Sequence, residues 1–195
     1  MRLFLDANVM TYIAFFEGYL LERTEGQKEE SVAGWTALQS SPPTIQLMRE
    51  IEALSILYHI DDQAHFDWLC SDVALNEVVK IRSQQKRKQH FDLLERLIEH
   101  RRDVYEEEGR SSLSEAPETL LSRLFPTLPL GMKNDALQYC EALLVEADYF
   151  LTNDQDFIRT VRQAPESIHT LSSDMRPVLI PAVKVSELSF IAELL

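Results

Sequence analysis

Short apolar runs that alternate with helical patterns constrain the fold of this chain more strongly than any other feature of its sequence. Residues with strand character occupy 2–6, 66–72 and 148–152, and the stretch 177–188 supplies a fourth strand and a closing segment. Helical patterns occupy 44–60, 86–108, 132–147 and 154–164. Strands that alternate with helices are typical of a parallel sheet covered by helices. The sequence therefore predicts an α/β fold with a central parallel sheet, in which ligands bind beyond the carboxyl ends of the strands.

Two of the predicted helices have an apolar face that indicates which residues they bury. Residues three or four positions apart share one side of a helix. We expect the inward faces to consist of Ile45, Met48, Ile51, Leu54 and Leu57 in the first helix and of Phe91, Leu94, Leu97 and Ile98 in the second.

Composition limits the functions that this chain can have. The net charge of −13 excludes a broad electrostatic attraction to nucleic acid and leaves local basic patches or bound cations as means of contact. The 195 residues suit a single domain, 1–195. Cys70 and Cys140 predict neither a disulfide framework nor a zinc site, and they fit a reducing, cytoplasmic location. Asp6 and Asn8 interrupt the apolar N-terminal stretch, so we expect neither a signal peptide nor a membrane span.

Acidic residues stand where the predicted strands end or where neighbouring helices begin. Asp6 ends the first strand, Asp154 follows the third, and Asp156 comes two residues later. Glu77 lies on the first turns of the helix after the second strand, and Asp135 begins the helix that leads to the third. Because the carboxyl ends of parallel strands meet at one edge of the sheet, we expect these side chains to lie near one another.

Two interpretations of these acids remain open at the level of the residues. Asp6, Asp135 and Asp154 each stand near a helix start, where a carboxylate caps N–H groups and interacts favourably with the helix dipole. Alternatively, the acids and the neighbouring Asn8 and Asn153 form an oxygen-rich pocket, which suits Mg²⁺ or Mn²⁺ better than zinc. Crowded carboxylates repel one another without a cation, so the second interpretation predicts a raised pKa for at least one of them.

Four segments resemble the motifs of PIN-domain nucleases, which include the VapC-type toxin ribonucleases. The segments are "LFLDANV", "SDVALNEVV", "KNDALQYCEALLVEADYFLTNDQDF" and "VLIPAVKVSEL", and they occur in the order that the family has. The stretch 133–157 is the most specific of them. The resemblance implies a three-layer α/β/α fold, with a helical insertion at about 24–60 that the compact toxins lack.

The resemblance also implies a role for each acid. The catalytic and metal-holding residues would be Asp6, Glu77, Asp135 and Asp154, with Asp156 as an accessory acid of the metal site and with Asn8, Ser71 and Asn153 as polar supports. The chain would then be an endoribonuclease that uses Mg²⁺ or Mn²⁺ to hydrolyse phosphodiester bonds of RNA. A protein antitoxin and a second copy of the chain are the partners that the resemblance implies.

A basic stretch follows the segment that carries Glu77. Residues 82–102 contain seven Lys or Arg against three Asp or Glu, in a chain that is acidic as a whole. A solvated helix face explains such a stretch without any function. The functional interpretation is a rim that contacts RNA phosphates, and the residues expected there are Arg82, Lys86, Arg87 and Lys88.

Two rival functions are compatible with the same residues. In a haloacid-dehalogenase-like phosphatase, Asp6 would be the nucleophile and Lys133 the lysine, but Asn8 stands where that family has its acid–base Asp and Glu77 has no role. In a catalytically inactive PIN-like interaction module, the acidic surface would bind a protein. In such a module, the four acids would repel one another and destabilise the fold, because no metal ion would be bound between them. Metal binding and activity on phosphate monoesters distinguish these functions from a nuclease.

Overall fold

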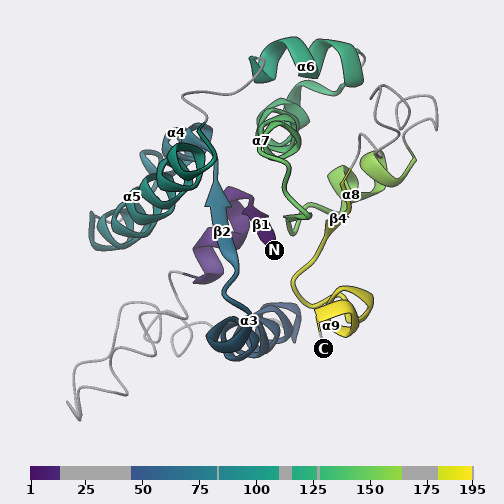
Figure 1. The fold of residues 1–195 in the computed structure, drawn as a ribbon. Helices are drawn as coiled ribbons and strands as arrows, with labels where there is room; N and C mark the ends of the chain where they lie inside the picture. The colour runs from purple at the N-terminus through teal and green to yellow at the C-terminus, as the bar shows by residue number, and fades with distance from the viewer. Residues whose placement is uncertain (14–44, 83, 110–115, 127, 164–179, 195) are drawn as a thin grey trace.

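The chain folds around a parallel sheet of four strands. The computed structural model describes residues 1–13, 45–82, 84–109, 116–126, 128–163 and 180–194 (Figure 1). Its strands are β1 (Arg2–Leu5), β2 (Asp67–Cys70), β3 (Tyr149–Leu151) and β4 (Ala182–Val183). Their order is β2-β1-β3-β4, and all neighbours are parallel. The predicted α/β fold with a central parallel sheet is therefore confirmed.

Helices connect the strands, as the alternating pattern predicts. Residues 7–13 are helical directly after β1. The other helices of the described residues are α3 (Ile45–Ala64), α4 (Leu75–Val78), α5 (Gln84–Glu107), α6 (Pro117–Leu124), α7 (Lys133–Leu144), α8 (Gln155–Arg162) and α9 (Leu188–Leu194), with single 3-10 turns at η1 (Asp72–Ala74) and η2 (Leu130–Met132). Within the described part of 177–188, the strand comprises only Ala182–Val183, and the end of the chain forms α9.

Both faces of the sheet are covered, because alternate strand residues point to opposite sides. Leu3 and Leu5 belong to a first core, which also contains residues from the 7–13 helix, α3 and α9. Phe4 belongs to a second core, which contains residues from α6, α7 and α8. Figure 1 shows α3 and α9 on one side of the strands and α6 and α7 on the other. The arrangement has three layers, with helices on both sides of the sheet.

Helix α5 packs along the edge strand β2 and contributes to both cores (Figure 1). Leu93, Leu94 and Ile98 enter the first core, whereas Val104 enters the second. A helix in this position covers a strand that would otherwise expose its backbone to other chains. The predicted burial of Leu94 and Ile98 is confirmed, but the prediction for Phe91 is wrong, because it is 37% exposed.

Helix α3 forms the second half of the predicted insertion and packs into the first core. Leu54 and Leu57 are fully buried, as predicted, but Ile45 is 76% exposed because it lies in the first turn, ahead of the part that packs. The buried Glu50 accepts hydrogen bonds from the N–H and the hydroxyl of Ser186, at 3.1 and 2.5 Å. These bonds tie α3 to the turn after β4. Residues 24–44 of the insertion, and the side chain of Met48, lie outside the described residues.

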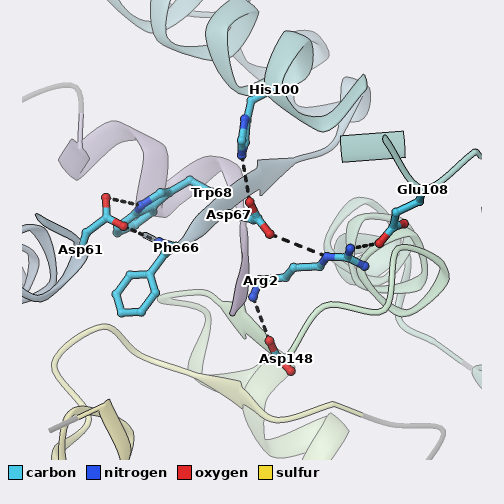
Figure 2. Close-up of polar contacts among 8 residues, drawn as sticks. All are labelled: Arg2, Asp61, Phe66, Asp67, Trp68, His100, Glu108 and Asp148. Atoms are coloured by element: carbon cyan, nitrogen blue, oxygen red, sulfur yellow. Dashed lines mark hydrogen bonds and ion pairs between the residues drawn. The ribbon is translucent and has the colours of Figure 1, made fainter. Parts of the chain in front are cut away.

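Charged groups connect the segments at the amino-terminal ends of the strands (Figure 2). The N–H of Arg2 donates to Asp148 Oδ2 at 2.8 Å, and its Nε lies 3.9 Å from Asp67 Oδ2. The guanidinium of Arg2 also pairs with Glu108 at the end of α5, and Nε2 of His100 lies 3.3 Å from Asp67 Oδ1. Arg2 and His100 thus lie beside acids at this end of the sheet.

Candidate active site

Asp6 lies beside the segment that follows β3, at the end of the sheet where the parallel strands have their carboxyl ends. This end is here called the carboxyl edge. Asp6 comes directly after β1, and its backbone N–H donates to the carbonyl of Leu151 at 3.0 Å. The two strands therefore end at the same level. Since side chains alternate along a strand, Asp6 points to the same face as Phe4. That face belongs to the second core, where α7 packs, so Asp6 and the start of α7 are neighbours.

Asp6 is buried, and both of its carboxylate oxygens accept hydrogen bonds. Its exposed fraction is 1%. Oδ2 accepts from the Thr152 hydroxyl at 2.6 Å and from Asn8 Nδ2 at 2.5 Å. Oδ1 accepts from Gln138 Nε2 at 3.3 Å. These donors hold the side chain in one orientation and favour its charged form.

Asn8 links Asp6 to the turn that precedes α8. Its Nδ2 also donates to Thr152 Oγ1 at 3.3 Å, and its Oδ1 accepts from the backbone N–H of Asn153 at 3.0 Å. Thr152 Oγ1 in turn accepts from the N–H of Asp154 at 3.1 Å. Asn8 therefore lies where a polar support is expected, and Asn153 contributes its backbone rather than its side chain.

Sequence reasoning did not include Thr152 and Gln138 among the site residues, although the spacing contains a signal for both. Thr152 stands two residues before Asp154, directly after a strand. Gln138 stands three residues after Asp135 and therefore on the same side of α7. Both are fully buried polar residues, which require hydrogen-bond partners. Thr152 and Gln138 could thus be identified from the sequence as polar residues two or three positions from a predicted site residue.

Asp154 is the N-cap of α8. Its Oδ1 accepts from the backbone N–H groups of Asp156 and Phe157, at 2.8 and 2.9 Å. The capping interpretation is therefore correct for this residue. Asp154 also forms a hydrogen bond with Asp135. The Asp154 carboxylate thus caps α8 and also interacts with Asp135.

Two substitutions separate these roles of Asp154. We expect Asp154→Ala to lower the free energy of unfolding by about 1 kcal/mol, because it removes the cap. Asp154→Asn keeps the capping oxygen and removes one repelling charge, so we expect it to leave the metal-free protein at least as stable as the wild type. Urea denaturation without metal measures both. Equal losses in the two variants would contradict the assignment of the cap to Oδ1.

Asp135 lies in the first turn of α7 and has a strongly shifted pKa. Its pKa is raised to about 7, first by burial and then by the charges of Asp6 and Asp154. The hydrogen bond to Asp154 and the charge of Glu77 raise it further. The N-cap of α7 is Met132, and no side chain caps this helix start. Asp135 is therefore placed as a helix-dipole residue and as a member of the acid group, not as a cap.

Asp6 has a raised pKa for related reasons. Burial is the largest cause and raises it to about 6, and the charges of Glu77 and Asp154 also raise it. The hydrogen bonds from Thr152 and from the Ala7 N–H act in the opposite direction. Two of the acids thus have a raised pKa, as predicted, but burial contributes more to both shifts than the repulsion between the carboxylates. Asp6, Glu77, Asp135 and Asp154, here called the four-acid cluster, interact although they come from four separate segments.

Glu77 reaches the cluster from α4, a single helical turn. The turn begins at η1, where the Ser71 hydroxyl caps the N–H of Val73 at 3.0 Å. The same hydroxyl donates to Glu141 on α7. Ser71 therefore supports the backbone that carries Glu77, and its hydroxyl is engaged with Glu141.

Asp156 does not share the surroundings of the four-acid cluster. Its side chain is exposed, and its Oδ1 lies 2.9 Å from Nη1 of Arg159 on the same helix. It is not among the groups that shift the pKa of Asp6 or Asp135. The structure therefore places this predicted accessory acid in a surface ion pair.

The donors of the four-acid cluster fit a hard divalent cation in their chemistry. They are carboxylate oxygens, which Mg²⁺ and Mn²⁺ prefer. Next to them, the buried Oδ1 and Nδ2 atoms of Asn153 and Oε1 of Gln138 have no hydrogen-bond partner among the described residues. In that same part of the chain, no three His, Cys, Asp or Glu side chains form a group that could hold a metal ion as they stand. The residues fit by type, whereas their present arrangement is not that of a formed metal site.

The predicted RNA-contacting residues lie near or at the start of α5. Arg82 and Lys88 are exposed and Arg87 is half-buried, while the side chain of Lys86 lies outside the described residues. Arg87 and Lys88 line an open hollow with Phe91 and two polar residues. Arg101, from the same basic stretch, is only 5% exposed and pairs with acids. It is therefore not positioned to contact a phosphate.

Comparison with protein-family models, with curated proteins and with solved structures gave no match. Among the described residues, no helix is long and apolar enough to cross a membrane. The structure shows an α/β fold with a four-stranded parallel sheet, and the four-acid cluster lies at the carboxyl ends of its strands.

Proposed function

We propose that this chain is a metal-dependent endoribonuclease of the PIN-domain type. The observation that carries the proposal is the four-acid cluster: carboxylates from four segments interact at the carboxyl edge of a parallel sheet, and burial and mutual repulsion raise the pKa of two of them. No cationic side chain is among the causes of those two shifts. Repelling acids in this position are stabilised by a bound divalent cation.

The residues of the cluster and their hydrogen-bond donors have different tasks in this proposal. Asp6, Glu77, Asp135 and Asp154 would hold Mg²⁺ or Mn²⁺, which when bound polarises a phosphoryl oxygen and lowers the pKa of water. The donors Asn8, Thr152 and Gln138 fix the orientation of Asp6.

A carboxylate must accept the proton of the attacking water. Asp135 and Asp154 are the candidates for this role. Asp135 is the better placed, because Oδ1 of Asp154 is engaged in capping α8.

The direct test is cleavage of a fluorescently labelled, mixed-sequence RNA by the purified chain. We expect cleavage with Mn²⁺ or Mg²⁺ and none with EDTA, and we expect Asp6→Asn to remove it. The same metals should raise the melting temperature of the wild type, because they bind the folded state only. Cleavage that persists in EDTA, or equal cleavage by Asp6→Asn, would refute the assignment of activity to the four-acid cluster.

The basic start of α5 is the proposed RNA contact. We expect Arg87→Glu or Lys88→Glu to weaken RNA binding and to flatten its salt dependence, by a slope of about 0.7 per lost contact with single-stranded RNA. Arg102→Glu is the matched control, because Arg102 is exposed on the same helix outside the predicted rim. Fluorescence anisotropy at several salt concentrations measures both quantities. An equal effect of Arg102→Glu would indicate that only net charge matters.

The proposal extends to a toxin of a toxin–antitoxin pair, with a protein antitoxin and a homodimer. This part rests on the resemblance to VapC-type motifs alone. Induced expression should stop bacterial growth for the wild type and not for Asp6→Asn, and light scattering of the purified chain gives its mass in solution.

The rival phosphatase function is less favoured by the residues around Asp6. Asn8 stands where that family has its acid–base Asp, and its Nδ2 donates to Asp6 Oδ2. Glu77, whose charge raises the pKa of Asp6, has no role in that function. Turnover of a phosphate monoester such as p-nitrophenyl phosphate would favour the phosphatase instead. An inactive interaction module would show neither cleavage nor a metal-induced rise in melting temperature.

A further inference from the structure

A buried network joins α5, the end of β2 and α7 beside the four-acid cluster. Arg101 and Glu141 are 5% and 6% exposed and form an ion pair. Arg101 Nη1 also donates to the carbonyl of Cys70 at 3.0 Å, and its Nη2 lies 3.0 Å from Asp72 Oδ2. The second oxygen of Glu141 accepts the hydroxyl of Ser71. These contacts end on the last residue of β2, on the turn that leads to Glu77, or on the helix that carries Asp135.

The turn that carries Glu77 depends on such contacts. It consists of η1 and α4, two consecutive single turns, and α4 has no side-chain cap of its own. Helices this short do not form in isolation, because nucleation is unfavourable. The hydroxyl of Ser71 caps η1, and Ala74 and Val78 pack into the first core. The position of Glu77 is therefore set by what holds residues 71–78.

Glu141 belongs to a polar stripe on the inner side of α7. Asp135, Gln138 and Glu141 follow one another at intervals of three residues. Asp135 belongs to the four-acid cluster, and Gln138 donates to Asp6 at the end of β1. Glu141 accepts from Ser71 at the end of β2. One helix thus holds the ends of two neighbouring strands at once.

We propose that Glu141 is a positioning residue for the proposed ribonuclease: by accepting the Ser71 hydroxyl and pairing with Arg101, it holds the turn 71–78 so that Glu77 faces the other three acids of the cluster. The inference rests on the proposed function. A buried ion pair is a weak source of stability, since apolar residues often replace it without loss. Apolar residues cannot, however, hold the hydroxyl of Ser71.

The kinetic test uses Glu141→Gln, which keeps the size of the side chain and removes its charge. We expect kcat for RNA cleavage to fall at least fivefold, with KM nearly unchanged, because Glu141 is buried and lies outside the proposed RNA contact. Glu118→Gln, an exposed acid on α6, is the matched control and should leave kcat unchanged. In a Glu77→Gln background, Glu141→Gln should have no further effect on kcat, because the residue that it positions is already lost.

A second measurement, the rate of amide hydrogen exchange, monitors the stability of the turn directly and does not require enzymatic activity. The N–H groups of Val79, Lys80 and Ile81 donate to carbonyls within this turn. In Glu141→Gln their hydrogen exchange should be at least tenfold faster, whereas the exchange of the Phe157 and Ile158 amides at the start of α8 should not change. Ser71→Ala should repeat this pattern.

The two measurements separate the possible failures. Unchanged exchange at residues 79–81 would overturn the inference whatever the activity shows. Faster exchange with an unchanged kcat would also overturn it, because the turn would then not matter for cleavage. An additive loss of kcat in the Glu77→Gln background would show a general structural effect and would likewise contradict positioning. Absence of cleavage by the wild type would refute the proposed function, while the exchange measurement would still test the hold on the turn.

Discussion

Asp135→Asn should lower metal-dependent RNA cleavage by about 10²- to 10⁴-fold, the range typical of a lost acid–base group. The substitution removes the charge of a central member of the four-acid cluster and changes its shape very little. Asp135 interacts with Asp6, Glu77 and Asp154, so its loss affects both the holding of a cation and the acceptance of a proton. Single-turnover cleavage at saturating Mn²⁺ measures the chemical step directly.

The same substitution should make the metal-free protein more stable at pH 8. The folded-state pKa of Asp135 is about 7, raised from 3.8. Between these values the folded state binds more protons than the unfolded state, so this group's contribution to stability falls as pH rises through the window from about 4 to 7. Asparagine removes this loss, and its advantage over the wild type should disappear below about pH 4. Urea denaturation in EDTA at several pH values measures the difference.

Asp156→Asn is the control for both effects. Asp156 lies two residues after Asp154 but is exposed and paired with Arg159. Its substitution should change neither cleavage nor the pH dependence of stability beyond experimental error. If Asp156→Asn were as damaging to cleavage as Asp135→Asn, Asp156 would belong to the site and the four-acid cluster would be incomplete.

Arg101→Met should lower the free energy of unfolding by about 3–5 kcal/mol, the loss expected when one partner of a buried ion pair is removed. Glu141 would keep its charge in a position that is 6% exposed, with the Ser71 hydroxyl as its remaining hydrogen-bond donor among the contacts described. The carbonyl of Cys70 would also lose a donor. Chemical denaturation at pH 7 gives the change from the shift of the midpoint.

Two further variants show whether the loss arises from the uncompensated charge. Arg102→Met, at the exposed neighbouring position, should cost less than about 0.5 kcal/mol. The double variant Arg101→Met, Glu141→Leu should be more stable than Arg101→Met alone, because it buries no unpaired charge. A double variant that is less stable than the single one would indicate that the size and shape of the two side chains matter more than their charges.

The sequence was sufficient to predict the sheet and the edge at which the acids meet. Strand-like runs that end in Asp6 and "LTND" define where β1 and β3 stop, and parallel pairing follows from the helices between them. The mutual influence of the acids on their pKa values agrees with that placement. These features depend on local pattern and on topology, both of which a single sequence contains.

Features that depend on packing were not predictable. Leu93 rather than Phe91 is buried in α5, because the helix crosses from one core to the other along β2. The hydroxyl of Thr152 and the amide of Gln138 gain their role from Asp6, which is distant in sequence. The resemblance implies a place for Asp156 in the metal site, but the first turn of α8 directs its side chain toward Arg159. Periodicity gives no information about which partner a side chain meets.

The strand order also determines when the four-acid cluster can form during synthesis of the chain. β1 lies in the middle of the sheet and leaves the ribosome first, yet its Asp6 receives the Thr152 hydroxyl from 146 residues further along the chain. Pairing between such distant segments is slow, because the loop must close before the contact forms. Asp154 is the last member of the four-acid cluster in chain order. The cluster therefore cannot form until the segment after β3 has been synthesised, and before that point Asp6 lacks the hydroxyl donor that Thr152 supplies.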